Sequence, residues 1–491
     1  MKPMFRSLAI ALSIIVSTTK MSGQGDSKLP PSSNPTQSDW TVMVYMNANN
    51  NLEPDAFVNF AEMATVDVNP AVNVILQFAR QAEYTPSPDW KGALRFKMRK
   101  GIEPTLEDSL DRQADPNIDE DHIPDPNMGD VKTLCEFVDW AEKQYPARHY
   151  MLVIWDHGDG WRAFDTVRIK APKKILATVL SKVSDERDSN LEKARELSSR
   201  VAPKAPPERI PKAETRVIPE DKVIQTAVFR AISVDDAHDG AKLYNYQIQT
   251  GLQKLLGDKK LDVMGFDACL MAMVETTYAM RNIARVMVGS EELEPGKGWN
   301  YTDWVGRLCA KSSIEPEELA SIVVGSYESY YKNARKPTTL SSIKLSEIDA
   351  LASSIDDLSD VLIRNVKTRH GLEVIRNARS SCFVYAPGCN LHGIDLGQFC
   401  DLLDTMSDDQ NVIGRAQNVR AELNKCVAAN YRSVDRPQSN GLAIYFPATE
   451  TLYKTDPSME GYDRDNTDNP VEFVKTRRWV RFLQAYFNRV P

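Results

Sequence analysis

Short apolar runs that alternate with helical stretches are the feature that most constrains how this chain can fold. Between the runs, stretches such as 130–145 repeat apolar side chains at the 3.6-residue spacing of a helix. Neighbouring parallel strands need a long crossover connection, usually a helix, and these helices cover both faces of the sheet. The pattern therefore predicts an α/β fold with a mostly parallel central sheet flanked by helices. The predicted strands lie at residues 40–47, 72–79, 150–155, 261–267 and 285–292.

The N-terminal segment has the composition of a secretory signal. Lys2 and Arg6 precede an apolar run at residues 8–16, and small residues follow it. This run is about half as long as the roughly 20 residues that span a bilayer, and no later run reaches that length. We therefore expect removal of the segment and export of a secreted, periplasmic or cell-surface protein without stable membrane insertion.

The chain of 491 residues is long enough for two or three domains. Its mild net charge of −8 gives no reason to expect nucleic acid as a partner. The second half is more helical, and we expect it to form a smaller C-terminal α/β region packed on the first domain. Strand-like runs in it lie at 381–387 and 441–448. The predicted regions are a signal peptide (1–25), a flexible leader (26–38), a main domain (39–300) and the C-terminal region (301–491).

Residues 166–222 interrupt the alternating pattern. Lys and Arg outnumber Asp and Glu there, and residues 201–220 are rich in proline. One interpretation is a solvated loop inserted into the main domain. The other is a linker that is cut after synthesis, because proteolysis concentrates in exposed, flexible segments.

Two polar turns follow predicted strands and carry residues suited to nucleophilic catalysis. His157 stands in "DHGDGW", after the strand at 150–155, and Cys269 stands in "DACL", after the strand at 261–267. If the two strands are neighbours in a parallel sheet, both turns lie beyond the same edge, where ligands bind in such sheets. A nucleophilic thiol needs a nearby base, and histidine titrates near neutral pH. Taken singly, a cysteine after a strand is more often a buried apolar residue.

The same turns contain groups that would assist the reaction. Cys269 stands at the head of a predicted helix at 270–284, where the helix dipole favours a thiolate. Gly158 has no side chain, so its N–H can reach a carbonyl oxygen together with the N–H of Cys269. We therefore predict His157 and Cys269 as catalytic residues, and the amides of Gly158 and Cys269 as an oxyanion hole.

Several blocks of the sequence resemble, in order, the signature blocks of the clostripain family of cysteine peptidases. They are "WTVMVYMNANNNLE", "VIWDHGDGW", "LDVMGFDACLMAMVE" and "SEELEPGKGWNY", and a later block is "GLAIYFP". The resemblance implies a caspase-like sandwich for residues 39–300 and cleavage of proteins or peptides after Arg or Lys. It also implies a His-Cys dyad, in which His157 matches the family histidine and Cys269 the nucleophile.

The resemblance assigns Asp267 to a pocket for the basic side chain of the substrate. A buried carboxylate can pair with a guanidinium through two hydrogen bonds, whereas it is costly beside a neutral group. The alternative is an acid that only holds the amides of the turn after the strand. Glu294 and Asp303 are weaker candidates for a second acid in the pocket, and Trp299 for an apolar wall.

The chemistry of a thiol and a histidine requires no cofactor, but members of the family often need calcium for activation. At residues 49–51 the family often has an acid where this chain has three asparagines, which puts a metal or pocket role of that turn in doubt. Acids elsewhere offer oxygen ligands, without indicating a particular set. They include Asp156, Asp159, Asp235, Asp236 and Asp239.

A peptidase that cuts after Arg or Lys would find substrate sites in its own basic insertion. We therefore hypothesise self-cleavage between about residues 168 and 222. Two other functions stay open: a metal-dependent hydrolase built on Asp156, His157, Asp159 and Asp267, and a binding module without catalysis. The seven cysteines are odd in number, so that at least one thiol is free, while disulfide pairing and oligomeric state are not predicted.

Overall fold

The computed structural model describes residues 37–491 with several gaps, and these residues belong to one compact unit. The predicted signal peptide, nearly all of the leader and the whole insertion at 166–222 lie outside the described residues. The gaps are residues 86–87, 89, 161–231, 335, 387–391, 456–461, 463, 466–469 and 490–491.

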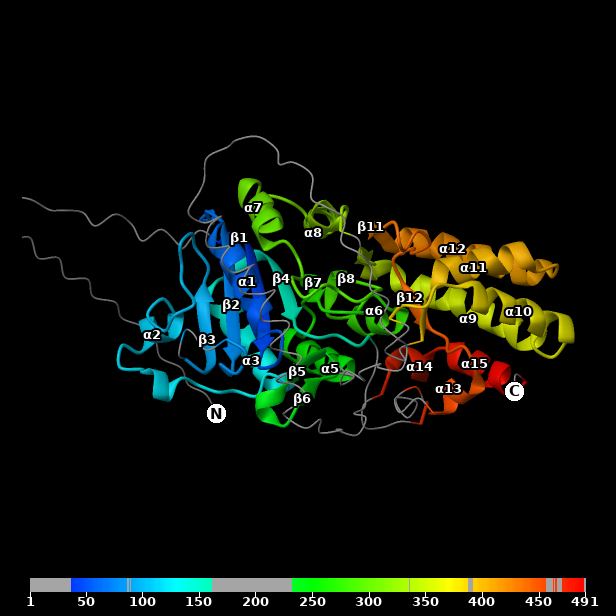
Figure 1. Ribbon diagram of the computed structural model, residues 1–491. Helices are drawn as coiled ribbons and strands as arrows, with labels where there is room; N and C mark the ends of the chain where they lie inside the picture. The colour runs from blue at the N-terminus through cyan, green and yellow to red at the C-terminus, as the bar shows by residue number, and fades with distance from the viewer. Residues whose placement is uncertain are drawn as a thin grey trace, which may run out of the picture. The chain divides into compact units, whose positions relative to one another are not determined.

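The helices and strands alternate through the first half of the chain, and helices prevail in the second half (Figure 1). No helix in the described part of the chain combines the length and apolarity that a membrane crossing requires. The elements are β1 (Ser38–Ala48), α1 (Glu53–Ala64), β2 (Val72–Arg80), β3 (Gly92–Lys97), α2 (Leu110–Ala114), α3 (Val131–Gln144), β4 (Ala147–Trp155), β5 (Ile232–Asp235), β6 (Ala241–Leu243), α5 (Asn245–Leu256), β7 (Leu261–Asp267), α6 (Val274–Met280), β8 (Ala284–Gly289), α7 (Tyr301–Ala310), α8 (Pro316–Tyr331), β9 (Thr339–Lys344), α9 (Ile348–Asn365), α10 (Arg369–Ser381), β10 (Gly393–Asp395), α11 (Leu396–Met406), α12 (Gln410–Cys426), β11 (Val427–Arg432), β12 (Ala443–Tyr445), α13 (Glu450–Thr455), α14 (Glu472–Thr476) and α15 (Trp479–Phe487).

One large sheet organises the described residues, with the strand order β11-β9-β8-β7-β4-β1-β2-β3. Its five central strands, from β8 to β2, are parallel to one another. The strands at the edges, β3 on one side and β9 and β11 on the other, pair in antiparallel fashion. The predicted α/β fold with a mostly parallel central sheet is therefore confirmed.

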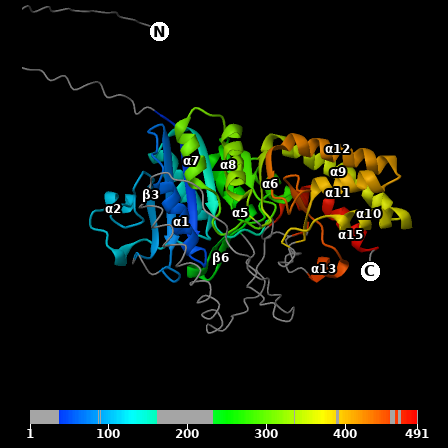
Figure 2. The ribbon, with the colours of Figure 1, turned by 45° about the horizontal axis from the view of Figure 1, so that its top comes forward.

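Side chains that alternate along the strands fill a separate core on each face of the sheet. In β1, Met43 and Tyr45 belong to the core covered by α3, α5 and α6, whereas Val42 and Val44 belong to the core covered by α1, α7 and α8. Successive side chains of a strand point to opposite faces, so a strand buried on both faces is apolar along most of its length. In Figure 2, α7 and α8 lie side by side over the sheet.

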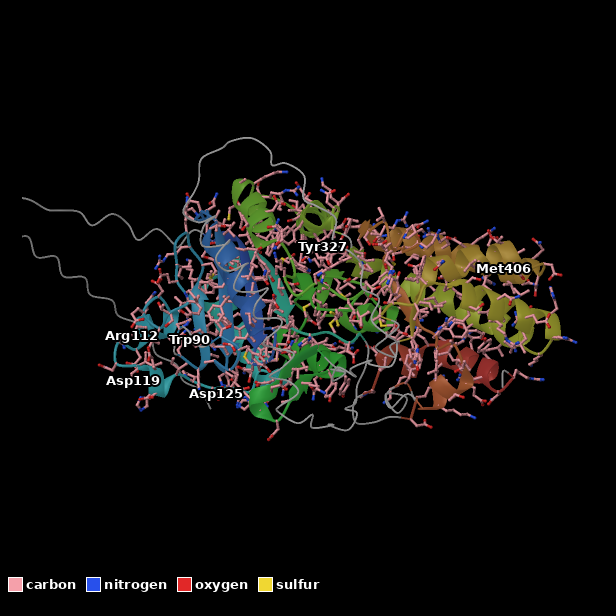
Figure 3. The ribbon with its side chains drawn as sticks, viewed as in Figure 1. Trp90, Arg112, Asp119, Asp125, Tyr327 and Met406 are labelled. Carbon is pink, nitrogen blue, oxygen red and sulfur yellow. The ribbon has the colours of Figure 1, made fainter. Side chains whose placement is uncertain are left out.

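The sheet continues across the predicted boundary at residue 300. Strands β9 and β11 come from beyond it and extend the sheet from β8. Tyr327 of α8, labelled in Figure 3, packs its ring against Tyr431 of β11 at a centroid distance of 5.9 Å. Farther along the chain, α9, α10, α11 and α12 pack against one another. The run at 441–448 contains β12, whereas the described part of 381–387 forms only an isolated bridge at Val384.

A buried ion pair ties the start of α1 to the end of β2. The guanidinium Nε of Arg80 lies 2.7 Å from the Glu53 carboxylate, and both side chains are fully buried. The same guanidinium donates to the carbonyl of Trp90, labelled in Figure 3, at 2.8 Å and lies over the rings of Trp90 and Phe57. The pair therefore anchors the loop after β2 next to the turn that joins β1 to α1.

We predict that Arg80→Met lowers the free energy of unfolding by about 3–5 kcal/mol, because it leaves the Glu53 carboxylate buried without its cation. Urea denaturation of the purified protein measures the change. The matched control is Lys311→Met, which removes an ion pair with Glu318 whose side chains are 63% and 47% exposed and should cost less than about 1 kcal/mol. Equal losses in the two variants would contradict the prediction.

Candidate active site

The two polar turns begin side by side because β4 and β7 are neighbouring parallel strands. Trp155, the last residue of β4, is in register with Asp267, the last residue of β7. The N–H of Asp156 then donates to the carbonyl of Asp267 at 3.3 Å. The turn that carries His157 and the turn that carries Cys269 therefore leave the same edge of the sheet at the same level.

Gly158 allows the two turns to touch. A Cβ atom at Gly158 would lie 2.3 Å from the carbonyl oxygen of Cys269 and 2.8 Å from its amide nitrogen. No real Cβ could lie this close to backbone atoms, so the two turns can approach each other only because residue 158 is glycine. The structure thus brings together three of the residues singled out in the sequence, His157, Gly158 and Cys269.

A buried carboxylate, that of Asp156, holds the histidine turn in place. One oxygen accepts from the amide of Asn50 at 2.7 Å and from the N–H of His157 at 2.5 Å. The other accepts from the amide of Asn47 at 2.9 Å and from the N–H of Val234 at 2.7 Å. Asp156 therefore joins the end of β1, the turn after β4 and strand β5.

The His157 imidazole is partly buried, and burial lowers its pKa to about 4. At neutral pH the ring is therefore uncharged and has one nitrogen able to accept a proton. Its Nε2 lies 2.9 Å from the amide oxygen of Asn51, at the end of the turn after β1. The sequence analysis did not predict this contact, although β1 and β4 both end in polar turns.

The environment of Cys269 differs from the sequence prediction in one respect. Helix α6 begins only at Val274, so the thiol is more than one turn away from the helix end, beyond the range of a helix dipole. The Cys269 Sγ instead accepts from the N–H of Glu294 at 3.2 Å. Leu270, the next residue, has a left-handed φ of +65°, a strained conformation of the kind found at functional sites.

The other described cysteines are poor nucleophiles. Burial raises the pKa of Cys135 to about 11 and the pKa of Cys382 and Cys426 to about 12, and it also raises the pKa of Cys309 and Cys400. Since the thiolate is the reactive form, burial makes these five thiols less reactive at neutral pH. No disulfide joins the six cysteines of the described ranges, and Cys389 lies outside these ranges.

Residues 290–294, here named the 290–294 strap, run along the turn that carries Cys269. The carbonyl of Ser290 accepts from the N–H of Ala272 at 2.9 Å, and the carbonyl of Glu292 accepts from the N–H of Leu270 at 3.2 Å. Together with the contact between Glu294 and Cys269, these hydrogen bonds fix the strap on one side of the thiol.

Residues of the C-terminal region also bind the strap, through its two glutamates. The Glu292 carboxylate accepts from Nε of Arg436 at 2.7 Å and from the N–H of Ala386 at 3.1 Å. The Glu291 carboxylate accepts from the N–H of Gly441 at 3.0 Å. Residues beyond 301 therefore support the Cys269 turn through the strap, a role that was not predicted from the sequence.

Two acids, Asp267 of β7 and Glu294 of the strap, neighbour each other. Asp267 is buried and accepts from the hydroxyl of Tyr301 at 2.9 Å and from the N–H of Trp299 at 3.2 Å. Burial raises the pKa of Asp267 to about 7. Burial and the neighbouring Asp267 carboxyl raise the pKa of Glu294 well above its usual range. Without a bound cation, such a pair of carboxyls retains a proton. A cationic side chain placed beside the pair would replace that proton favourably.

The structure places the remaining pocket candidates differently. Asp303 lies on α7 with its carboxylate 3.7 Å from Arg307 and 41% of its side chain exposed. This is a surface ion pair, whereas Glu294 is the acid that neighbours Asp267. Trp299 is fully buried, and its ring packs against Gly265 of β7.

The acids considered for calcium show no preformed site. Both oxygens of Asp156 and both oxygens of Asp235 already accept hydrogen bonds from N–H groups. Among the described residues, no three His, Cys, Asp or Glu side chains are grouped as metal ligands. Asp156 and Asp235 thus do not fit a calcium ion in this conformation.

We predict that Gly158→Ala separates the two turns, because the new Cβ meets the backbone of Cys269. Alkylation of Cys269 by iodoacetamide, followed by peptide mapping, should slow by about 10-fold as the base moves away from the thiol. The free energy of unfolding should fall by about 1–3 kcal/mol. The matched control is Gly306→Ala on α7, where a Cβ meets nothing within 4 Å and should change neither result adversely. Unchanged alkylation in Gly158→Ala would contradict the prediction.

Comparison with known proteins agrees with this geometry. The model of the clostripain family matches residues 44–175 and 218–486. Clostripain of Hathewaya histolytica is 22% identical over 463 residues, which cover 84% of this chain and 76% of that protein. A secreted C11 cysteine protease of Bacteroides thetaiotaomicron, solved with an irreversible peptide inhibitor, has a TM-score of 0.55 at 18% identity and covers 91% of this chain and 99% of its own. An inactive zymogen C11 protease of Parabacteroides distasonis has a TM-score of 0.52 at 17% identity, with coverages of 86% and 96%.

These solved relatives share the fold, with the caspase-like arrangement of a parallel sheet between helices that the sequence led us to expect. The family match extends over both halves of the chain and includes His157 and Cys269. The chain therefore belongs to the clostripain family of cysteine peptidases.

Proposed function

We propose that the protein is an exported endopeptidase that cleaves after Arg or Lys, with Cys269 as nucleophile and His157 as base. The observation that carries the proposal is the contact of Gly158 with the backbone of Cys269, which puts a histidine turn and a thiol turn at one sheet edge. Export is supported by the signal-like N-terminus and by the secreted relative of Bacteroides thetaiotaomicron.

In the proposed reaction, His157 takes up the proton of the thiol and later passes it to the leaving amine. His157 takes the proton of the Cys269 thiol, and the sulfur attacks the carbonyl carbon after the basic residue. The N–H groups of Gly158 and Cys269 donate to the oxyanion of the tetrahedral intermediate. His157 then returns the proton to the leaving amine, and water hydrolyses the thioester with the same histidine as base.

The acid pair of Asp267 and Glu294 would bind the basic side chain of the substrate. The Glu294 N–H contacts the thiol, while its carboxyl neighbours Asp267, so a charged pocket would begin beside the nucleophile. A guanidinium or ammonium group there neutralises acids that are costly to bury alone. This arrangement favours Arg and Lys over neutral residues.

Self-processing and calcium activation belong to the proposal as well. Self-cleavage would fall in the basic segment between about residues 168 and 222, which lies outside the described residues. Strand β5 follows that segment and is held by Asp156, so the chain after a cut would remain attached to the histidine turn. Calcium, if required, would need ligands other than Asp156 and Asp235; loss of activity with a chelator and recovery with added calcium would test it.

A binding module without catalysis is the main alternative. It predicts that a chain with an alkylated thiol keeps every function, whereas the peptidase proposal predicts complete loss of hydrolysis. The metal-dependent hydrolase has less support, because Asp156 and Asp267 are engaged by N–H and O–H donors.

We predict that Cys269→Ala lowers hydrolysis of fluorogenic peptides ending in Arg or Lys by at least about 1,000-fold, since it removes the nucleophile. Mass spectrometry should also find the variant intact where the wild type is cut between about residues 168 and 222. Peptides ending in Asp or Leu should resist both proteins. The matched control, Cys135→Ala, removes another partly buried thiol and should retain activity. Hydrolysis that survives Cys269→Ala would exclude Cys269 as the nucleophile.

We predict that binding of a small guanidinium ion such as agmatine weakens as the pH falls through about 7, where the buried Asp267 takes up a proton. The pocket is charged above this pKa and loses charge below it, so the inhibition constant should rise toward acid pH. Asp267→Asn should weaken binding about 10- to 100-fold at pH 8, because it removes one of the two pocket acids. Asp303→Asn, on the surface of α7, is the matched control and should leave both unchanged. An inhibition constant that is the same at pH 5 and pH 8 would count against the assignment.

A further inference from the structure

The three asparagines of the turn after β1 have three different partners. The amide of Asn49 donates to Asp235 at 3.0 Å, and the amide of Asn50 donates to Asp156 at 2.7 Å. The amide oxygen of Asn51 instead lies 2.9 Å from Nε2 of His157. Only this third contact reaches the side chain of the proposed base.

The contact with Asn51 favours one of the two tautomers of the neutral His157 ring. A neutral imidazole has one N–H and one lone pair, and an amide oxygen can only accept. The oxygen of Asn51 therefore holds the hydrogen on Nε2 and leaves the lone pair on Nδ1. Because burial keeps the ring neutral at physiological pH, the choice of tautomer decides whether the base can act.

We propose that Asn51 is a positioning residue that fixes the ring orientation and tautomer of His157, so that Nδ1 accepts the proton of the Cys269 thiol. The proposal rests on the proposed function and adds a third member to its two catalytic residues. When the thiol proton moves to Nδ1, the hydrogen on Nε2 stays where it is and its bond to Asn51 strengthens, because the donor is now charged. The same proton later leaves Nδ1 for the amine, and the ring returns to its starting tautomer.

The turn does not need the Asn51 side chain for its own shape. The Asn47 side chain accepts from the N–H of Asn49 at 3.1 Å, and the Asn50 side chain accepts from the N–H of Leu52 at 2.9 Å. These two hydrogen bonds hold the main chain of the turn, and the side chains of Asn49 and Asn50 are buried. Asn47 and Asn50 thus maintain the shape of the turn, whereas the Asn51 side chain contacts His157.

The test compares two substitutions of similar size at Asn51. Asn51→Leu removes the acceptor and should lower kcat for an Arg peptide about 10- to 100-fold with KM nearly unchanged, because orientation of a general base is lost. Asn51→Asp keeps an acceptor and should retain most of kcat. It should also move the acid limb of the pH profile upward, since a carboxylate beside the ring raises the pKa of His157. Wild-type kcat in Asn51→Leu, or equal losses in the two variants, would overturn the proposal.

Two controls separate this inference from the proposed function. Asn49→Ala damages the same turn without touching His157 and should keep kcat within about 3-fold, as expected of a residue remote from the reacting atoms. Cys269→Ala, assayed in parallel, tests the nucleophile alone. If Cys269→Ala is inactive and Asn51→Leu is fully active, only the role of Asn51 fails; if Cys269→Ala is active, the proposed function fails.

A direct measurement covers the case in which Asn51→Leu folds poorly. Nitrogen-15 NMR of labelled histidine in the full-length Cys269→Ala protein reports which ring nitrogen of His157 carries the hydrogen. We expect the Nε2–H tautomer at neutral pH, and a mixture of tautomers once Asn51→Ala is added. An Nδ1–H tautomer in the protein that retains Asn51, or a tautomer unaffected by Asn51→Ala, would refute the proposal.

Discussion

The parallel pairing of β4 with β7 is the constraint on which the rest of the site depends. It places Trp155 opposite Asp267, so the chain leaves both strands at the same level. Parallel strands in register present their carboxyl ends together, and the turns beyond them are free to carry functional groups because the sheet already satisfies the backbone. Every contact between the histidine turn and the cysteine turn follows from this pairing.

Buried carboxylates hold in place the turns that follow β4 and β7 at the edge of the sheet. Asp156 joins three segments with four hydrogen bonds, and Glu292 connects the 290–294 strap to Arg436 of the C-terminal region. A buried acid is costly unless donors surround it, so each one fixes the segments that provide its donors. The acid pair of Asp267 and Glu294 differs, because two carboxyls lie next to each other, where we propose that the cation of the substrate binds. Structural acids and the proposed substrate-binding acids are thus distinguished by their partners.

The site was predictable where residue type and strand order carry the information. Histidine and cysteine in polar turns after two apolar strands pointed to one sheet edge, and the structure makes those strands neighbours. The helix predicted at 270–284 begins only at Val274, because residues 268–273 form a turn that packs along the 290–294 strap. Glu294 neighbours Asp267, whereas Asp303 pairs with Arg307 on the surface of α7, and the sequence does not distinguish these two surroundings. Asn51 was passed over as one asparagine of three, since their different partners arise only in three dimensions.

The sequence by itself determined the layered α/β architecture, the family and the residue types able to do the chemistry, because periodicity, strand composition and turn residues are local properties of the chain. Only the tertiary structure decided which groups act together. The distance from Asn51 to His157, the pairing of Asp267 with Glu294 and the support of the strap by Arg436 join residues that are 106, 27 and 144 positions apart. Such contacts depend on strand register and on the burial of each side chain. Neither property can be predicted from one segment of the sequence alone.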